Sequence, residues 1–157
     1  MKNTLYKFSL LSIIIFFTTT TIAQSKQSKT DKEITNALQI WNQSTKASDL
    51  DAVMNLFENS ENIMLIGSDN GEIYKGKEQI SKWLSMLFKH NSFEWEMKRI
   101  DIDSFKNTAW VFVEGFMIVT NDKGNKQTTP YRFSGVLVKH KHDWQWRLFD
   151  GSIPRGE

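Results

Sequence analysis

Residues 93–120 read FEWEMKRIDIDSFKNTAWVFVEGFMIVT, and the spacing of the apolar side chains in this stretch decides the fold. At its start, large apolar residues alternate with charged ones, which is typical of a β-strand with one buried face. The alternation changes parity near Lys98-Arg99, and this predicts a β-bulge there. From Thr108 to Thr120 the chain is apolar on both faces except at Glu114. We therefore expect two long strands of one antiparallel sheet.

The sheet is expected to continue downstream of this stretch. The segment Asn121–Asn125 (NDKGN) is rich in residues that favour a hairpin turn. Gln127–His140 should return as a further strand, with a tight turn after it at Lys141–Asp143. The segment Trp144–Ser152 then closes the sheet as its last long strand.

In the first half of the chain the apolar residues follow helical spacing instead. Thr30 and Glu33 form a capping-box pattern at the start of a first helix that runs to about Ala47. Asp49 is placed to cap a second helix, since its carboxylate can accept a free amide at a helix start. A third helix with a clear apolar stripe is expected after Gly76.

A short hairpin is expected between the second and the third helix. Asn62–Ile66 and Glu72–Tyr74 are its two strands, and Asp69-Asn70-Gly71 is the turn between them. Helices first and a long antiparallel meander afterwards predict the α+β class. We expect about four long strands, a short hairpin and three helices.

The N-terminus has the three-part pattern of a secretory signal peptide at residues 1–23. Lys2 and Lys7 form the basic start, Phe8–Phe17 is an apolar run, and Thr21-Ile22-Ala23 precedes the expected cut before Gln24. The apolar run is too short to cross a bilayer, which needs roughly 20 such residues. We expect cleavage, export to a periplasmic or extracellular compartment, and no membrane span in the mature protein.

The mature chain is expected to be one domain at 33–154, preceded by a polar and flexible lead-in at 24–32. The signal carries two of the 20 basic side chains and none of the 18 acidic ones, so 18 of each remain after cleavage. This balance argues against a nucleic-acid partner, because phosphates demand clustered Lys and Arg. The chain has no cysteine, so its core must supply the stability without disulfides.

The recognisable catalytic and metal-binding motifs are missing from the sequence. It holds no nucleophile elbow, phosphate loop or metal-ligand spacing. His140 and His142 flank Lys141 at the expected turn, but two imidazoles without a third ligand do not make a metal site. We therefore expect neither a bound metal nor a cofactor.

The elements occur in a recognisable order, namely a helix pair, a short hairpin, a helix that starts with Gly-x-x-x-Ile, and four long antiparallel strands. The residues that mark this order are Trp41, Ser48-Asp49-Leu50-Asp51, Gly76 with Ile80, Thr108-Ala109-Trp110, Tyr131-Arg132-Phe133 and Trp144 to Pro154. The chain from Asp31 to Pro154 thereby resembles the nuclear transport factor 2-like proteins, and more narrowly their SnoaL-like branch. The resemblance implies a cone-shaped, curved antiparallel sheet wrapped by three helices around one cavity.

Proteins of that family differ widely in what they do. They include steroid isomerases, polyketide cyclases, dehydratases, epoxide hydrolases and the association domain of calcium/calmodulin-dependent protein kinase II, so the resemblance implies a fold and not a reaction. In many SnoaL-like members the last strand carries a histidine near the cavity, where this chain has Leu148 and Asp150. A mechanism that needs this histidine is not expected here.

Asp150 is the first candidate catalytic residue. Alternation along the last strand puts it on the face of Trp144, Trp146 and Leu148, and an apolar wall of this kind suits a general acid or base. The alternative is that Asp150 caps the turn at Gly151-Ser152, where an Asp side chain accepts local backbone amides.

Glu114 is the second candidate, because a carboxylate among apolar residues of its own parity is costly unless it is paired or protonated. Either it lines the cavity opposite Arg132 on the neighbouring strand, or it lies on the outer face of the sheet at a dimer contact. Arg132 is accordingly either an anchor for an anionic ligand or the partner of Glu114.

The leading functional hypothesis is a binding module whose aromatic-lined pocket takes a small apolar or amphipathic molecule. Trp41 and Trp146 are the residues that we expect to line this pocket. Tyr74, Trp110 and Arg132 are further candidate ligand contacts.

Two alternatives remain open from the sequence. One is an isomerase, cyclase or dehydratase in which Asp150 or Glu114 moves a proton while Arg132 or Tyr74 stabilises negative charge. The other is a purely structural domain whose cavity is filled by side chains. A homodimer is expected in either case, because Thr108–Thr120 can turn only one of its two apolar faces to the core.

Overall fold

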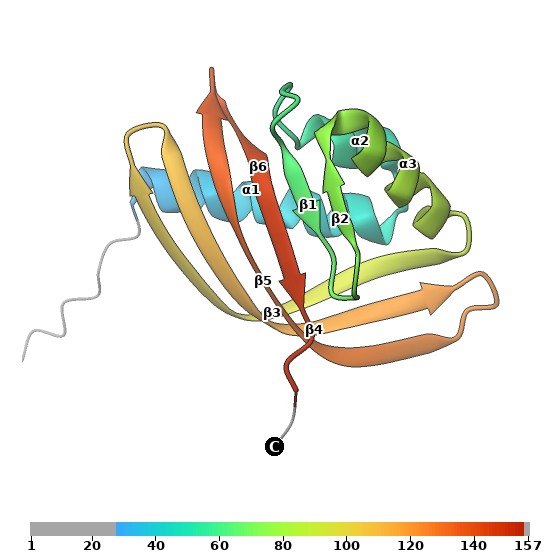
Figure 1. Cartoon of the computed structure of the whole chain (residues 1–157). Coiled ribbons are helices and arrows are strands. Elements are labelled where there is room, and N and C mark those ends of the chain that lie inside the picture. Colours follow the sequence, from blue (N-terminus) through green and yellow to red (C-terminus); the bar gives the residue numbers. More distant parts are fainter. Residues whose placement is uncertain (1–27, 156–157) are drawn as a thin grey trace, which may run out of the picture.

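The computed structural model describes residues 28–155, and Figure 1 shows how their helices and strands are arranged. The expected signal peptide and the lead-in up to residue 27 lie outside these residues. The elements follow in the predicted order. They are α1 Lys29–Lys46, α2 Leu50–Asn55, β1 Met64–Ile66, β2 Ile73–Lys75, α3 Gly76–Phe88, β3 Asn91–Phe105, β4 Thr108–Asn121, β5 Lys126–His140 and β6 Asp143–Ser152.

The strands form one open, strongly curved sheet in the order β2-β1-β6-β5-β4-β3. Its four long strands are joined by hairpin turns, and each is antiparallel to the next. The helices pack against the hollow side of the sheet, where α1 runs across the long strands (Figure 1). The predicted α+β class, with a cone-like sheet wrapped by helices, is therefore confirmed.

The bulge that the sequence predicts in the first long strand is present. β3 pairs with β4 along its whole length, and the register shifts between Met97 and Arg99. A bulge adds one residue to one of two paired strands and sharpens the local bend and twist. The curvature that makes room for a cavity therefore has one of its causes in this part of the sheet.

The first short strand departs from the expectation of a purely antiparallel sheet. β1 pairs antiparallel with β2 but parallel with β6, with Met64 opposite Leu148 and Ile66 opposite Asp150. A hairpin turn forces its two strands to run in opposite directions. About half of the chain lies between β1 and β6, so no turn restricts their relative direction.

A second bulge, which we did not predict, lies in β6. In the pairing of β6 with β5 the register skips Arg147, so this residue has no partner residue on β5. Trp146 faces the core before the skip and Phe149 faces it afterwards, which means that the inward positions change parity. Asp150 consequently lies on the convex face of the sheet, opposite Ser134.

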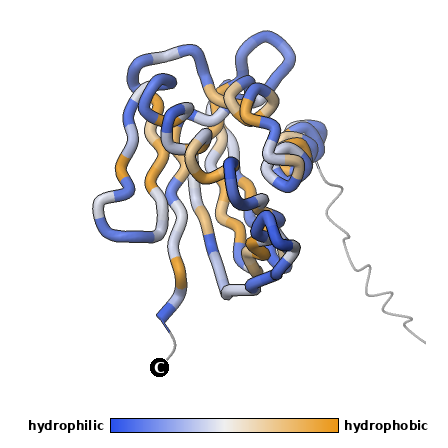
Figure 2. Tube along the Cα trace, turned by 90° about the vertical axis from the view of Figure 1, so that its right-hand side faces the viewer, coloured by the Kyte–Doolittle hydropathy of each residue, from blue (hydrophilic) through white to orange (hydrophobic). Residues whose placement is uncertain are grey.

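An aromatic cluster fills the space between α1 and the sheet. Trp41 of α1 packs on Phe57, Trp146 and Phe149, with ring centroids 6.0, 5.9 and 5.0 Å apart. Phe133 of β5 extends the cluster by stacking on Phe149 at 5.1 Å. Figure 2 shows hydrophobic residues along the strands and helices and hydrophilic ones at most of the turns. Burial of these large rings is a main source of stability in a chain without disulfides.

The first helix begins earlier than the capping box expected at Thr30 and Glu33. Ser28 is the N-cap, because its Oγ accepts the Asp31 N–H at 3.0 Å while an Asp31 carboxylate oxygen accepts the Ser28 N–H at 3.1 Å. Residues 29–32 are therefore helical and do not belong to a flexible lead-in.

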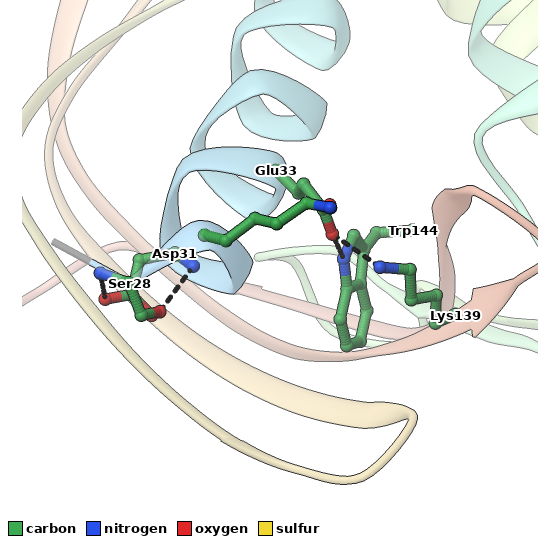
Figure 3. Close-up of polar contacts among 6 residues, drawn as sticks. Ser28, Asp31, Glu33, Lys139 and Trp144 are labelled. Carbon is green, nitrogen blue, oxygen red and sulfur yellow. Dashed lines mark hydrogen bonds and ion pairs between the residues drawn. The ribbon is translucent and has the colours of Figure 1, made fainter.

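Glu33 does not form the predicted capping box but bonds with residues far away in sequence. Its Oε2 accepts hydrogen bonds from Lys139 Nζ at 2.6 Å and from Trp144 Nε1 at 3.2 Å (Figure 3). These bonds fasten the first turn of α1 to the hairpin of β5 and β6.

The second helix starts as predicted, with the Ala52 N–H donating to Asp49 Oδ1 at 3.0 Å. In the part of the chain between residues 28 and 155, no helix is both long and apolar enough to span a bilayer.

Candidate functional site

A cavity of about 210 Å³ lies between the helices and the hollow side of the sheet. Helices α1 and α3 line one side of it, the long strands line the other, and the turn between β1 and β2 borders one end. Seven of the residues in its wall are aromatic, namely Trp41, Trp83, Phe88, Phe93, Trp95, Tyr131 and Phe149. Leu65, Leu84, Leu87 and Met117 complete the apolar part of the wall.

The position of α1 on the sheet is fixed by hydrogen bonds at the cavity wall. Asn42 accepts the Trp95 N–H at 2.7 Å and donates to the Trp95 carbonyl at 3.1 Å, as a strand neighbour would. Thr45 Oγ1 accepts the indole N–H of Trp95 at 3.2 Å and itself donates to the Trp41 carbonyl at 3.0 Å. The side chains of Asn42 and Thr45 therefore satisfy the polar groups of Trp95, and they hold the Trp95 ring in place.

The indole N–H of Trp41 is a buried donor without a hydrogen-bond partner among the described residues. Its ring meets Phe57 and Trp146 edge to face, at interplanar angles of 74° and 69°.

The polar end of the cavity is built around the hydroxyl of Tyr131. Burial raises the pKa of Tyr131 to about 12, and the negative charges of Glu72, Asp150 and Asp69 act in the same direction. A hydrogen bond with the Ser68 side chain works against this rise in pKa and does not cancel it. Tyr131 is accordingly a neutral hydrogen-bonding group at every physiological pH.

The Tyr131 hydroxyl fits only because position 151 is a glycine. A Cβ atom on Gly151 would lie 1.9 Å from the hydroxyl oxygen, far inside van der Waals contact. The end of β6 thus leaves the room into which the phenol of the neighbouring strand extends.

The turn between β1 and β2 carries the charged groups of the site. Glu72 Oε2 accepts the Asp69 N–H at 3.0 Å, and the Gly67 N–H donates to the Glu72 carbonyl at 2.8 Å, so Glu72 holds the turn in shape. A Cβ on Gly67 would lie 2.0 Å from the same carboxylate, which explains the glycine. Within the described chain neither Asp69 nor Glu72 forms an ion pair, and no Lys, Arg or His lines the cavity.

The structure brings one of the residues that we expected to line the pocket into its wall. Trp41 lines the cavity and is 2 % exposed. Trp146 is 1 % exposed and lies behind the wall, in the core. Tyr74 also lies behind the wall, where its ring stacks on that of Trp83 at 4.7 Å.

Asp150 does not lie on the face that the alternation predicts. The bulge at Arg147 turns it away from Trp144 and Trp146, and it is not part of the cavity wall. Its carboxylate acts on the cavity only through its charge, which contributes to the raised pKa of Tyr131. Among the described residues it accepts no hydrogen bond from Gly151 or Ser152 either, so the turn-cap interpretation lacks support.

Glu114, Arg132 and Trp110 all lie on the convex face of the sheet. Glu114 is directly opposite Arg132, as one interpretation of the sequence had it, but both are exposed and they form no ion pair. Arg132 instead donates to Ser152 Oγ at 3.3 Å. Trp110 is 48 % exposed and borders an open depression on this outer face. These residues therefore cannot contact a molecule inside the cavity.

Several residues of the site were missed by the sequence analysis, above all Tyr131, Trp95, Asp69 and Glu72. Trp95 was recognised only as a residue on the buried face of a strand. The pair Asp69 and Glu72 was recognised only as part of a turn and a short strand, because nothing local shows that this turn folds over the cavity. The buried alternation of Tyr131 with Phe133 was the available signal for the phenol.

The charged residues of the described chain do not gather into a metal site. No group of three or more His, Cys, Asp or Glu side chains between residues 28 and 155 is arranged to hold an ion. His140 and His142 lie exposed at the turn between β5 and β6.

Comparison with known families identifies the family to which the chain belongs. The sequence profile of the SnoaL-like domain matches residues 34–156. A comparison with curated protein sequences gave no match.

Solved structures with the same fold come from several bacteria. A proposed dehydratase of the NTF2-like family from Streptomyces avermitilis superposes with a TM-score of 0.71 at 8 % identity, covering 80 % of this chain and 97 % of that one. A nuclear transport factor 2 (NTF2-like) superfamily protein from Salmonella enterica serovar Typhimurium gives 0.68 at 20 % identity, covering 80 % and 91 %. A proposed scytalone dehydratase from Novosphingobium aromaticivorans gives 0.69 at 14 % identity, covering 79 % and 83 %. Identities this low establish a common fold and nothing finer.

Proposed function

Since the chain belongs to the SnoaL-like domain family, its fold provides an interior cavity, and we propose that this cavity binds a small apolar or amphipathic molecule. The observation that carries the proposal is the composition of the wall, in which aromatic rings surround the space and the charged groups come from one turn. Ligand pockets typically have this make-up, with a few polar groups that fix the orientation of an otherwise apolar ligand.

The size of the cavity limits the ligand. An apolar cavity of about 150 Å³ is large enough to hold benzene. The volume here is about 210 Å³, so a molecule of one or two rings fits with little rearrangement. The Tyr131 hydroxyl and the β1–β2 turn would then meet the polar end of such a molecule.

A second candidate function is proton-transfer catalysis of the isomerase, cyclase or dehydratase type. The observation in its favour is that a protonated phenol and two carboxylates share one end of the cavity. Glu72 or Asp69 would move a proton, and Tyr131 would donate a hydrogen bond to an oxygen that gains negative charge. Two of the similar structures are proposed dehydratases, which is consistent with this candidate at the level of the fold.

We further propose that the convex face forms a homodimer. Apolar side chains of neighbouring strands lie side by side there, with Trp110 opposite Val136 and Val136 opposite Leu148. Large apolar areas on a surface usually mark an interface. A second copy of the chain would cover this face and leave the cavity on the other side of the sheet free.

The binding proposal is tested with two substitutions at adjacent positions of β4. Met117 lines the cavity, whereas Ile118 points to the opposite face of the same strand. We expect one- or two-ring aromatic compounds to raise the melting temperature of the wild type, since a ligand that binds only the folded state stabilises it. Met117→Trp should abolish this shift by filling the cavity, while Ile118→Trp should retain it.

Two results would count against the proposal: no compound stabilises the protein, or both variants respond alike. Analysis of the recovered compound then separates the two candidate functions. A compound that is bound and returned unchanged supports the binding protein, and a converted compound supports the enzyme.

A further inference from the structure

The charged groups that border the cavity are all of one sign. Asp69 and Glu72 contribute carboxylates from the β1–β2 turn, and no Lys, Arg or His of the described chain lines the wall. We propose that the cavity selects organic cations, namely aromatic or alicyclic amines whose ammonium group lies at Asp69 and Glu72 while the ring enters the cavity. This inference rests on the proposed binding function and names its ligand class.

The two carboxylates are not neutralised within the protein. Glu72 Oε2 accepts the Asp69 N–H, but its other oxygen and the whole Asp69 carboxylate have no partner in the described chain. A ligand that covers this end of the cavity removes water from these oxygens. Removing water from a charge is costly unless the ligand supplies an opposite charge or hydrogen-bond donors. An ammonium group supplies both.

The causes of the raised pKa of Tyr131 indicate the sign of the electric field at this end of the cavity. Burial is the largest cause of its raised pKa, and each charged group that adds to the effect is a carboxylate. The same field that opposes a phenolate at this position favours a cation and opposes a carboxylate or phosphate on a ligand. Among cationic, neutral and anionic ligands, an anionic one is therefore expected to bind most weakly.

The apolar part of the wall also suits a cation. Trp83 of α3 and Trp95 of β3 line the same cavity as the two carboxylates, and Tyr131 adds a third electron-rich ring. Aromatic faces, those of Trp most of all, attract ammonium groups electrostatically. Rings and carboxylates together form the kind of surroundings in which alkylated amines are recognised.

The experiment uses three compounds with one ring system and different end groups. They are 1-naphthylmethylamine, 1-naphthalenemethanol and 1-naphthaleneacetate, which are a cation, a neutral molecule and an anion at neutral pH. Titration calorimetry should give the amine an affinity about tenfold higher than that of the alcohol, since two partly exposed ion pairs and one cation–π contact together reach this magnitude. The acetate should bind more weakly than the alcohol. In about 1 M salt, where charges are screened within roughly 3 Å, the amine and the alcohol should converge.

Substitutions assign the preference to the named carboxylates. The double variant Asp69→Asn, Glu72→Gln keeps the side-chain oxygen that holds the turn but removes both charges. It should lower the affinity for the amine several-fold, so that only the cation–π part of its advantage over the alcohol remains, and leave the affinity for the alcohol unchanged. Glu114→Gln is the matched control, because it removes one negative charge from the opposite face of the sheet. It should change none of the three affinities.

The outcomes separate this inference from the binding proposal. If the alcohol binds and Met117→Trp blocks it, but the amine binds no tighter, then binding stands and the selection of cations is wrong. The selection is also wrong if the double variant weakens all three compounds alike. If none of the three compounds binds, both the binding proposal and this inference are wrong.

Discussion

Among single residues, Tyr131 links the fold to the site most directly. It belongs to the buried alternation of β5, and it also lines the cavity. The sequence showed the first property and not the second. Whether a buried tyrosine faces a packed core or a cavity depends on the elements that cover it, and here these are α1, α3 and a distant turn.

We predict that Tyr131 makes stability depend on pH in the alkaline range. The unfolded chain ionises this residue near pH 10, whereas its pKa in the folded protein is about 12. The raised pKa means that the stabilisation is complete below pH 10 and is lost as the pH rises through about 12. The difference corresponds to on the order of 2 kcal/mol of unfolding free energy.

Denaturant unfolding of the wild type and of Tyr131→Phe between pH 9 and pH 12 measures this dependence. The variant lacks the ionisable hydroxyl, so its stability should fall less steeply than that of the wild type over this range. Equal slopes for the two proteins would show that Tyr131 is not responsible.

At the scale of elements, the two bulges show what a sequence pattern can and cannot reveal. The bulge in β3 was predictable because charged residues on both sides of Lys98 make the change of parity visible. The bulge in β6 was not, because Leu148 continues the apolar alternation of Trp146 while Phe149 next to it is equally apolar. Either residue could face the core, and tertiary packing chose Phe149. The wrong prediction of the sheet face on which Asp150 lies follows from this single ambiguity.

The start of α1 illustrates the same limit. Two overlapping capping boxes are present, one from Ser28 to Asp31 and one from Thr30 to Glu33. The local sequence does not show which of the two boxes caps the helix. The structure uses the first, because Glu33 bonds with Lys139 and Trp144, which lie far away in sequence.

This long-range contact gives a prediction at the scale of elements. Hydrogen bonds from Lys139 and Trp144 lower the pKa of Glu33, so its stabilisation is complete above the unfolded-state pKa and is lost as the pH falls through the lower folded-state value. Glu33→Gln should lower the melting temperature at pH 7 and have little effect in acid, once Glu33 of the wild type is protonated.

A double-mutant cycle with Lys139→Gln should show coupling between Glu33 and Lys139. Lys29→Gln is the control, since Lys29 lies 4.0 Å from Glu33 and is almost fully exposed. It should have a smaller effect on the melting temperature than either partner of the 2.6 Å contact. The absence of coupling between Glu33 and Lys139 would contradict the assignment.

At the scale of the whole molecule, the sheet separates two surfaces with different properties. Its hollow side carries the cavity, and its convex side carries the half-exposed apolar residues of β4, β5 and β6. The sequence predicted that β4 is apolar on both faces, and this was enough to expect a partner. It could not show which of the two faces holds Glu114 and Trp110.

We predict a dimer through the convex face. Light scattering at tens of micromolar should give the mass of two chains for the wild type and of one chain for Trp110→Glu, because a charge would have to be buried at the interface. Met86→Glu is the control, since Met86 is an equally exposed apolar residue on α3. It should remain a dimer. A monomeric wild type would refute the prediction.

Export is a separate prediction for the whole molecule, and it concerns residues outside the described part of the chain. Mass spectrometry of the protein from its native cell should find a mature chain that begins at Gln24. Soluble protein that retains Met1 in the cytoplasm would contradict this prediction.

The fit of Tyr131 against Gly151 has a consequence for the evolution of this protein. The two positions lie on neighbouring strands and share one volume, so a side chain at one can grow only if the other becomes smaller. Related sequences should therefore exchange these two residues together, with a glycine at 151 wherever a tyrosine stands at 131. A lineage that acquires even an alanine at 151 must first give up the phenol, and with it the present polar end of the cavity. Divergence of ligand preference in such relatives would then begin with a mutation on β6, at a residue that has no side chain of its own.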